Sequence, residues 1–494
     1  MSSAAKTKPT KAIPFSSIDQ WHYTSDVVVV GYGGAGSCAA IEAADAGCST
    51  MIVELASGPG GSTALSSAEI YMGGDGGTRV QAACGYADTN QAMIDYLTAC
   101  AGPQADVAKI TAYVEGSREH FNWLVQQGVP FKDSEYKERA IMALTDDCLL
   151  YTGSEKAWPF NELAEPCPRG HNLEVEGDNG GPLFMQIMQE AVARRDIQTH
   201  FDCRALTLIQ DEHGTVRGLR IREDMQEKNV MANKGVILCA GGFVMNDAMV
   251  KKYAPSLQKC TVPIGNPGDT GAGILMGMGV GGAAINMHEG FVSVPYYPPA
   301  SMTYGIFVNA QGQRFINEDC YHGRVGAYVL EQPGNGVYLV MNVDDYANYE
   351  EVSYLAAQVA GTGETVEELG QELNLPQGQL VQTVSTYNSH AAKGCDPLFH
   401  KSKDWLKPLR PPFVALNVTP GQGAFLPYFT LGGLDTLPSG EVLSAEGDPI
   451  VGLYAAGRTA CGVPRRGKGY NSGISVGDAT FTGRMAGKAA AARA

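Results

Sequence analysis

The chain lacks long apolar runs and paired cysteine motifs, and both absences narrow its class. No stretch of about 18 apolar residues occurs among the 494, so we expect no transmembrane span. The N-terminus lacks the apolar segment of a secretory signal, and we expect residues 1–23 to form a disordered tail. The twelve cysteines occur singly, without a C-x-x-C pair, which argues against a metal site or a disulfide framework. Such thiols are typical of a cytoplasmic protein.

Basic residues are also in the minority. The chain has 36 Lys and Arg against 52 Asp and Glu, which gives a formal net charge of −16. Proteins that bind nucleic acid carry a basic surface, so the composition argues against a nucleic-acid partner. An acidic excess of this size serves solubility and does not identify a partner.

The most specific pattern present is a buried strand that runs into a glycine-rich turn. Val27–Val30 precede Gly31, Gly33 and Gly36 in a G-x-G-x-x-G pattern. In a dinucleotide-binding unit the first glycine allows a tight turn and the second lets the backbone approach a pyrophosphate. The third lets the following helix pack on the strand. A second strand ends at Glu54, where an acidic side chain binds a ribose hydroxyl. The pattern therefore predicts that the chain binds a dinucleotide.

Other glycine-rich segments lie far from this turn in the sequence. Residues 58–67 form a loop of glycines and hydroxyl side chains, which we expect to reach back over the cofactor. Residues 235–243 form a second buried strand that enters a double-glycine turn. Residues 291–411 differ in composition, with short strands, a hairpin turn and several helices. We therefore expect one nucleotide domain, assembled from separated segments and interrupted by an inserted domain.

Together these segments resemble the flavoprotein family of fumarate reductases, succinate dehydrogenases and 3-ketosteroid dehydrogenases. The matching segments span nearly the whole chain: the glycine turn with Glu54, Gly60–Thr63, Gly241–Phe243, Gly268–Asp269, Val308–Glu318, Gly432–Leu434, Leu453–Gly457 and Gly473–Gly487. The resemblance implies bound FAD and an α/β fold, in which a Rossmann-like FAD-binding domain carries an inserted α+β cap domain. It implies an FAD-binding domain over residues 24–290 and 412–494, with the cap over 291–411.

The resemblance also implies which residues contact FAD. They are Gly31, Gly33, Gly34, Ala35, Gly36, Glu54, Gly61, Ser62, Thr63, Ser66, Ala205, Ala240, Gly241, Asp269, Gly457, Ser472, Ile474 and Ser475. In this family the last helix directs its N-terminus at the flavin, where its dipole stabilises negative charge on the reduced ring.

Within the family, the loop before the last helix resembles that of the 3-ketosteroid Δ4-(5α)-dehydrogenases. The loop contains Tyr470 and Ser472 and lacks the histidine-plus-arginine pattern of the dicarboxylate reductases. Tyr321 in the cap completes the trio of two tyrosines and a serine that these steroid dehydrogenases use. The resemblance implies that a C4–C5 double bond is introduced into a 3-ketosteroid, with a proton removed from C4 and a hydride from C5 to flavin N5. The partners are then an apolar steroid and an electron acceptor that the sequence does not identify.

This chemistry suits hydroxyl side chains. A donor aimed at a developing enolate oxygen is worth about 2.7–4 kcal/mol, and a positioned proton acceptor contributes ~10²–10⁴-fold. We assign the C3 carbonyl to Tyr470 and the C4 proton to Ser472, assisted by Tyr321, although the two roles can be exchanged. His322 and Tyr304 are alternative occupants of the place of Tyr321.

Three other functions stay open. A reductase of an unsaturated acid such as fumarate or urocanate would bind a carboxylate through Arg465, Arg466 or Lys468. A 3-ketosteroid Δ1-dehydrogenase also uses tyrosines, although its last loop has a different pattern. A flavin carrier without turnover is the third, and the complete cap weighs against it.

Two further segments have both a functional and a structural interpretation. His171 either lines the flavin or lies at the surface. Residues 296–299 read Tyr-Tyr-Pro-Pro and form either the wall of a pocket for a flat apolar substrate or a hinge between domains.

Overall fold

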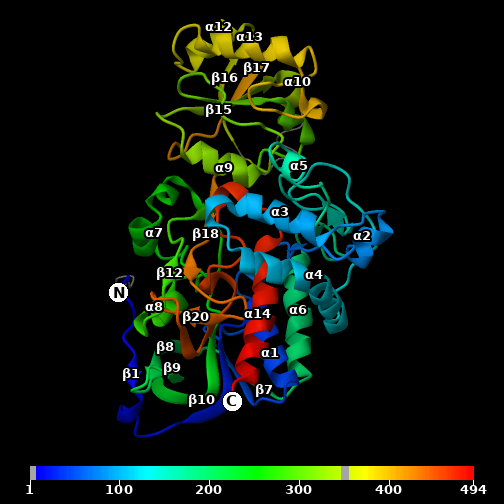
Figure 1. Ribbon diagram of the computed structural model, residues 1–494. Coiled ribbons are helices and arrows are strands. Elements are labelled where there is room, and N and C mark those ends of the chain that lie inside the picture. The colour runs from blue at the N-terminus through cyan, green and yellow to red at the C-terminus, as the bar shows by residue number, and fades with distance from the viewer. Residues whose placement is uncertain (1–6, 347–354, 356) are drawn as a thin grey trace.

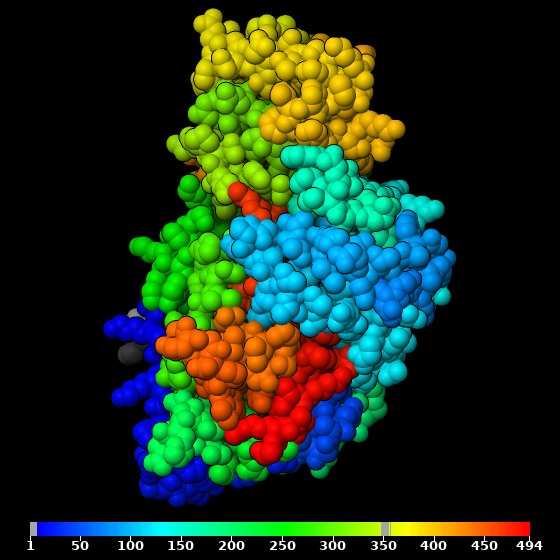
Figure 2. Space-filling model, viewed as in Figure 1, coloured from blue at the N-terminus to red at the C-terminus, as the bar shows by residue number. Residues whose placement is uncertain are grey.

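The computed structural model describes residues 7–346, 355 and 357–494. The molecule is elongated, with a large lower part and a smaller upper part (Figure 1). The space-filling view shows the same division, with the yellow residues of the small part at one end and the red residues of the last helix in the lower half (Figure 2).

A nine-stranded sheet forms the centre of the lower part. Its strands are β1 (Ile13–Pro14), β2 (Tyr23–Val30), β3 (Thr50–Val53), β7 (Ile197–His200), β8 (Arg204–Gln210), β9 (Val216–Glu223), β10 (Gln226–Leu238), β20 (Glu441–Leu443) and β21 (Pro449–Ala455). The order along the main path is β1-β8-β9-β10-β2-β3-β7. β10 pairs in parallel with β2 and β21, and its first half pairs antiparallel with β9. β10 therefore joins segments from the two ends of the chain in one sheet.

The valine run of β2 has both of its faces covered. Val27 and Val29 pack in the cluster that contains α1 (Gly34–Asp45), whereas Val28 and Val30 pack in the cluster on the other side of the sheet. All four valines are buried. A continuous β-branched run is typical of a parallel strand between two layers, and the α/β prediction is confirmed.

The remaining lower part contains helices and short strand pairs around the sheet. The helices are α2 (Arg79–Ala83), α3 (Asn90–Ala101), α4 (Val107–Gln127), α5 (Phe160–Leu163), α6 (Gly180–Ala193), α7 (Asp247–Tyr253), α8 (Ala272–Gly279) and α14 (Ile474–Ala492). The small sheets contain β4 (Ile70–Tyr71), β6 (Gly170–His171) and β5 (Leu149–Leu150), then β11 (Val262–Pro263), β18 (Pro427–Thr430) and β13 (Gly290–Val292), and finally β12 (Ala284–Ile285) with β19 (Gly433–Leu434).

The two helices α1 and α14 run side by side in close contact (Figure 1). A Cβ added to Gly483 would overlap the carbonyl oxygen of Ala35, and one added to Gly487 would overlap that of Ala39. The glycines therefore allow the backbones to approach closely. Arg484 lies between them and is fully buried, with its Nε donating to Glu42 at 2.6 Å. This contact fixes the position of the first turn of α14 relative to the glycine turn before α1.

The upper part has its own sheet and core. Its strands are β14 (Ile306–Asn309), β15 (Val337–Asn342), β16 (Val359–Gly363) and β17 (Phe413–Asn417), and its helices are α9 (His322–Leu330), α10 (Val343–Tyr346), α12 (Val366–Glu372) and α13 (Gln379–Ala391). The strand order is β14-β15-β17-β16. Residues of β14, α12 and α13 form a separate buried cluster. Because β17 belongs to this sheet, we propose that the cap extends past residue 411 to about residue 417.

The prediction of a disordered tail is wrong for part of residues 1–23. Residues 1–6 lie outside the described residues. β1 pairs in parallel with β8, and the amide of Thr10 donates to the carbonyl of Leu275 at 2.8 Å. The edge of β8 offers unpaired backbone groups, and the segment satisfies them. Within residues 7–346, 355 and 357–494, no helix combines the length and the apolar character needed to cross a bilayer.

We expect the substitution Gly483→Ala to destabilise the protein and to weaken FAD binding. The new methyl group would overlap the backbone of Ala35, which lies on the main cavity. Overpacking typically costs about 1–3 kcal/mol, more than the gain of about 1 kcal/mol that alanine brings to a helix. Urea unfolding and flavin content measure the two effects. Gly58→Ala is the control, because its Cβ would meet nothing within 4 Å; equal behaviour of both variants would contradict the role of this contact.

Candidate active site

One cavity of about 860 Å³ extends from the glycine turn to the first turn of α14. This volume lies in the upper part of the range for small-molecule and cofactor sites. Its lining comes from the carboxyl ends of β2, β3 and β10, from residues 61–69, from the cap segment around Tyr321 and from residues 470–479. Ligands bind at this end of the strands in open α/β sheets.

The glycine turn is held by close backbone contacts. Gly31 has φ +105°, and a Cβ there would overlap the carbonyl oxygen of Cys239. A Cβ on Gly36 would overlap the carbonyl oxygen of Gly31, so Gly36 serves the packing of α1 and lies behind the cavity lining. Gly33, by contrast, lines the cavity, and a Cβ there would meet its neighbours Gly60 and Gly61 only at ordinary contact distances of 3.7 and 3.8 Å. The first and third glycines therefore shape the turn, while the second leaves room for a ligand.

Glu54 is held at the end of β3 with its carboxylate in the cavity lining. Its Oε2 accepts from the amide of Tyr32 at 2.6 Å, and its Oε1 accepts from the amide of Ala56 at 2.8 Å. Both bonds fix the carboxylate and leave lone pairs for a ribose hydroxyl.

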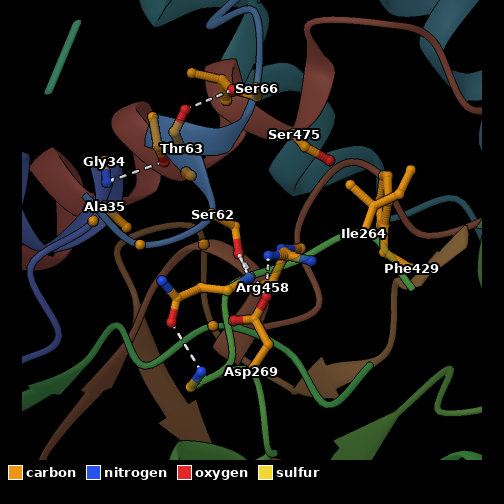
Figure 3. Close-up of a pocket in the computed structure, with 18 of the residues that line it drawn as sticks. Gly34, Ala35, Ser62, Thr63, Ser66, Ile264, Asp269, Phe429, Arg458 and Ser475 are labelled. Carbon is orange, nitrogen blue, oxygen red and sulfur yellow. Dashed lines mark hydrogen bonds and ion pairs between the residues drawn. The ribbon is translucent and has the colours of Figure 1, made fainter. Parts of the chain in front are cut away.

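Ser62, Asp269 and Arg458 point toward one another in the middle of the cavity (Figure 3). Asp269 Oδ2 accepts from Ser62 Oγ at 2.6 Å and from Arg458 Nη2 at 2.6 Å. Figure 3 also shows Thr63 between Gly34 and Ser66, with the amide of Gly34 donating to Thr63 Oγ1 at 3.2 Å. Arg458 was not predicted from the sequence, although it directly follows the predicted Gly457.

The predicted cofactor residues gather on this cavity with two exceptions. Those that line it are Gly31, Gly33, Gly34, Ala35, Glu54, Gly61, Ser62, Thr63, Ser66, Ala205, Ala240, Gly241, Asp269, Gly457, Ser472 and Ser475. Gly36 and Ile474 lie behind the lining, in the packing of α1 and in the aromatic cluster.

The residues present fit FAD. The glycine turn leaves space beside an N-terminal helix end, which suits a pyrophosphate. Glu54 suits a ribose, and the polar cluster of Ser62, Asp269 and Arg458 suits a polyhydroxyl chain. The N-terminus of α14 borders the other end of the cavity, where its dipole favours negative charge on a ring.

Aromatic side chains enclose the end of the cavity near α14. Phe291 packs on Phe429, with ring centroids 4.8 Å apart, and on Tyr470 at 4.6 Å. The rings of Tyr321 and Tyr470 are 6.4 Å apart and tilted by 33°. All four residues line the cavity. The result is an aromatic end of the cavity with two phenol groups on its border.

Both phenols are neutral at ordinary pH. Burial raises the pKa of Tyr470 to about 12. Burial also raises the pKa of Tyr321 well above its usual range, and the neighbouring Ser472 hydroxyl lowers it in part. The hydroxyl of Tyr470 donates to Ser475 Oγ at 2.8 Å, in the first turn of α14. These groups therefore present hydrogen-bond donors without a formal charge.

The loop that carries Ser472 is held by backbone hydrogen bonds. Its amide donates to the carbonyl of Thr152 at 3.0 Å, and the next residue, Gly473, accepts from the amide of Tyr71 at 3.1 Å. Gly473 is the N-cap of α14 with φ 83°, and no side chain caps this helix end. The Ser472 hydroxyl is therefore available to the cavity rather than used as a cap.

The sequence did not single out Glu69, which also lines this end of the cavity. Burial raises the pKa of Glu69 to about 8, while the hydroxyls of Thr152 and Ser472 oppose part of the rise and Glu155 adds to it. In the sequence, Glu69 is marked only as an acidic residue between the hydroxyl-rich loop and β4, which is too little to predict a place in the site.

The alternatives to Tyr321 lie in different places. His322 lines the cavity beside Tyr321; its Nδ1 lies 2.7 Å from Ser293 Oγ, and burial lowers its pKa to about 3. Tyr304 packs on Trp405 and is absent from the described lining of the cavity.

Two predicted functional segments stand away from the cavity. His171 is buried in β6, where its Nε2 lies 2.8 Å from Thr78 Oγ1. It belongs to the core, so neither the flavin contact nor the surface position is correct. Tyr296 and Tyr297 are buried behind the wall; the hydroxyl of Tyr297 accepts from the amide of His322 at 3.2 Å.

The three cations considered for a carboxylate substrate also lie elsewhere. Arg465 is buried and donates to the carbonyls of Gly462 and Cys461. Arg466 packs against Gly102, and Lys468 pairs with Glu331 at 2.7 Å. Among the described residues, the cations that line the cavity are Arg204 and Arg458. Arg204 lies next to Cys203, whose amide donates to the carbonyl of Glu54 at the nucleotide end, and Arg458 is paired with Asp269.

The chain is similar to several known proteins over most of its length. The 3-ketosteroid-Δ4-(5α)-dehydrogenase of Rhodococcus jostii RHA1, solved in complex with 4-androstene-3,17-dione, is 41% identical; the match has a TM-score of 0.92 and covers 98% of this chain and 100% of that chain. The 3-oxo-5-alpha-steroid 4-dehydrogenase of Comamonas testosteroni is 26% identical over 503 residues, which are 89% of this chain and 93% of the relative. The fumarate reductase (cytochrome) of Shewanella frigidimarina is 27% identical over 483 residues, 95% of this chain and 77% of the relative.

The family described as FAD binding domain matches residues 26–471, most of the chain. This confirms the resemblance inferred from the glycine turn, the inserted cap and the last helix. It also confirms FAD as the cofactor. The chain belongs to the FAD-binding family of flavoproteins that includes fumarate reductases and 3-ketosteroid dehydrogenases.

Proposed function

We propose that this protein is an FAD-dependent 3-ketosteroid Δ4-dehydrogenase. The observation that carries the proposal is the aromatic end of the cavity, which is bordered by neutral phenols while its nearest cation, Arg458, is already paired with Asp269. Such a space suits a flat apolar molecule with a carbonyl group, and the described residues that line this end offer no free cation for a dicarboxylate. The similarity to the steroid dehydrogenase of R. jostii over nearly the whole chain supports the same substrate class.

FAD would be held by the glycine turn, Glu54 and the cluster of Ser62, Asp269 and Arg458. When bound, the flavin supplies the hydride-accepting atom for C5 of the substrate. The protein's task at the same moment is to manage charge at the substrate's C3 oxygen and C4 proton.

Tyr470 donates a hydrogen bond to the C3 oxygen in our assignment. Its hydroxyl lies at the N-terminus of α14, where Ser475 at 2.8 Å can receive or supply its proton. The negative charge that develops on the C3 oxygen is then next to a donor and to the positive end of a helix dipole. Ser472, with Tyr321 beside it, takes the proton from C4.

The electron acceptor and the location are also proposals. We propose that a soluble acceptor reoxidises the flavin, and we place the enzyme in the cytoplasm. All twelve cysteines are free thiols, and eleven of them are buried or partly buried, which supports the proposed compartment.

We expect a saturated 3-ketosteroid to bleach the flavin when it is added without oxygen. The product should carry its new double bond between C4 and C5, because we assign removal of the C4 proton to Ser472. Absorbance spectra follow the flavin, and NMR of the product locates the bond; a C1–C2 double bond would indicate the Δ1 activity instead. No bleaching, combined with reoxidation of the reduced protein by fumarate, would overturn the proposal.

We expect Tyr470→Phe, Ser472→Ala and Tyr321→Phe to retain FAD while losing turnover. Loss of an oxyanion donor lowers turnover ~10²–10³-fold, and loss of a proton acceptor ~10²–10⁴-fold. Steady-state rates and flavin absorbance measure the two properties. Tyr304→Phe, outside the described lining of the cavity, is the matched control and should keep its rate. Near-normal turnover in all three site variants would refute the assigned roles.

A further inference from the structure

Among the described residues, Glu69 is the acidic side chain that lines the aromatic end of the cavity, near α14. It precedes β4, is 2% exposed and lines the cavity together with Ser472 and Tyr470. Its Oε2 accepts from the side-chain amide of Asn172 at 3.1 Å. Among the described residues, none donates a hydrogen bond to the buried Oε1.

A buried carboxylate that serves the fold is normally saturated with hydrogen bonds. Glu155, a close neighbour, follows this rule. Its Oε1 accepts from the hydroxyl of Tyr71 at 2.9 Å, and its Oε2 accepts from the amide of Gly153 at 2.9 Å. Glu69 differs because one of its oxygens has no such partner. An unsatisfied buried oxygen on a cavity wall indicates a group that is used transiently.

The free oxygen of Glu69 lies beside the loop that carries Ser472. A Cβ added to Gly473 would lie 3.0 Å from Glu69 Oε1. The nearby hydroxyls of Ser472 and Thr152 lower the pKa of this carboxyl group. The backbone of Ser472 is clamped to Thr152, and that of Gly473 to Tyr71, the second residue after Glu69. The geometry therefore keeps the serine hydroxyl and the carboxylate adjacent.

A serine hydroxyl does not hold an additional proton at neutral pH. When it accepts a proton from carbon, it must release its own proton to a stronger base. Tyr321 and Tyr470 face the same space, but burial raises the pKa of both phenols, so they are neutral and present no phenolate to receive a proton. Glu69 is the described side chain next to Ser472 that has a vacant acceptor atom.

We propose that Glu69 receives the proton that Ser472 takes from the substrate. This inference rests on the proposed function. The C4–H bond breaks, its proton joins the Ser472 oxygen, and the original Ser472 proton moves to Glu69 Oε1. The carboxylate becomes a neutral carboxylic acid, while the hydride from C5 leaves to the flavin. Glu69 is thus a relay residue that acts through Ser472.

The charged and titratable neighbours set the pH at which the relay works. Burial, together with the charge of Glu155, raises the pKa of Glu69 to about 8, while Tyr321 and Tyr470 contribute no charge at neutral pH. Only ionised Glu69 can accept a proton, so turnover should increase with pH and level off above about 8. A base whose pKa lies near the working pH is effective in such a transfer.

The first test is the pH profile of turnover with a saturated 3-ketosteroid. We expect Glu69→Gln to retain FAD, to lose turnover by ~10²-fold or more, and to lose the increase that is centred near pH 8. Glu155→Gln is the matched control, because it also neutralises a buried carboxylate in the same region. It should keep the increase with pH.

The second test uses the FAD-loaded protein without substrate. A carboxyl whose pKa is raised on folding contributes stability that is present below its unfolded pKa and is lost as pH rises through its folded pKa. The melting temperature of Glu69→Gln relative to the wild-type protein should therefore increase between about pH 5 and pH 9. A constant difference across this range would mean that Glu69 does not bind a proton on folding, and would contradict the inference.

The outcomes separate the relay from the proposed function. If the wild-type protein does not oxidise ketosteroids, the function fails, whatever the melting temperatures show. If the wild-type protein does oxidise them and Glu69→Gln keeps its rate and its pH profile, the relay is refuted and the function stands. If Glu69→Gln does not fold, Glu69→Asp is used in its place. A normal turnover rate and a normal pH profile in this variant, whose side chain is shorter, would contradict the relay.

Discussion

The close contact between α1 and α14 is the constraint on which the site depends. Gly483 and Gly487 let the two backbones meet, and Arg484 joins them through a buried ion pair with Glu42. Each helix begins at the cavity, α1 after the glycine turn and α14 after Gly473. Two helix N-termini therefore border the same cavity, one at the glycine turn and one at the aromatic end. The distance between these ends is set by side-by-side packing, rather than by a loop.

The aromatic end of the cavity offers polar hydrogen-bonding groups without a free charge. Its phenols are neutral, and its nearest cation is bound by Asp269. An apolar ketone can enter such a space without leaving a charged group unpaired, whereas a dicarboxylate would have to compete with Asp269 for Arg458. The described cations expected to serve a carboxylate substrate are used for packing elsewhere. Whether a member of this family binds a ketone or a dicarboxylate thus depends on which cationic side chains in the cavity lack an acidic partner.

Local patterns predicted much of the fold, because their physics is contained in a few neighbouring residues. The valine run before Gly31 and the helix after it follow from β-branching and glycine geometry, and both are present. Arg458 and Glu69 could not be predicted in the same way. Asp269 is 189 residues from Arg458, and Ser472 is 403 residues from Glu69, so only the folded chain brings them together. The pairing of β1 with β8 escaped prediction for the same reason.

The central claim is that the aromatic end of this cavity binds the A ring of a 3-ketosteroid. A crystal structure of the FAD-loaded protein with a bound 4-ene-3-ketosteroid tests it most directly. The account predicts the C3 oxygen within hydrogen-bond distance of the Tyr470 hydroxyl and C4 beside Ser472, with the ring in the aromatic end of the cavity that Phe291 lines. A steroid bound outside the cavity, or a dicarboxylate held by Arg458 in its place, would contradict the account.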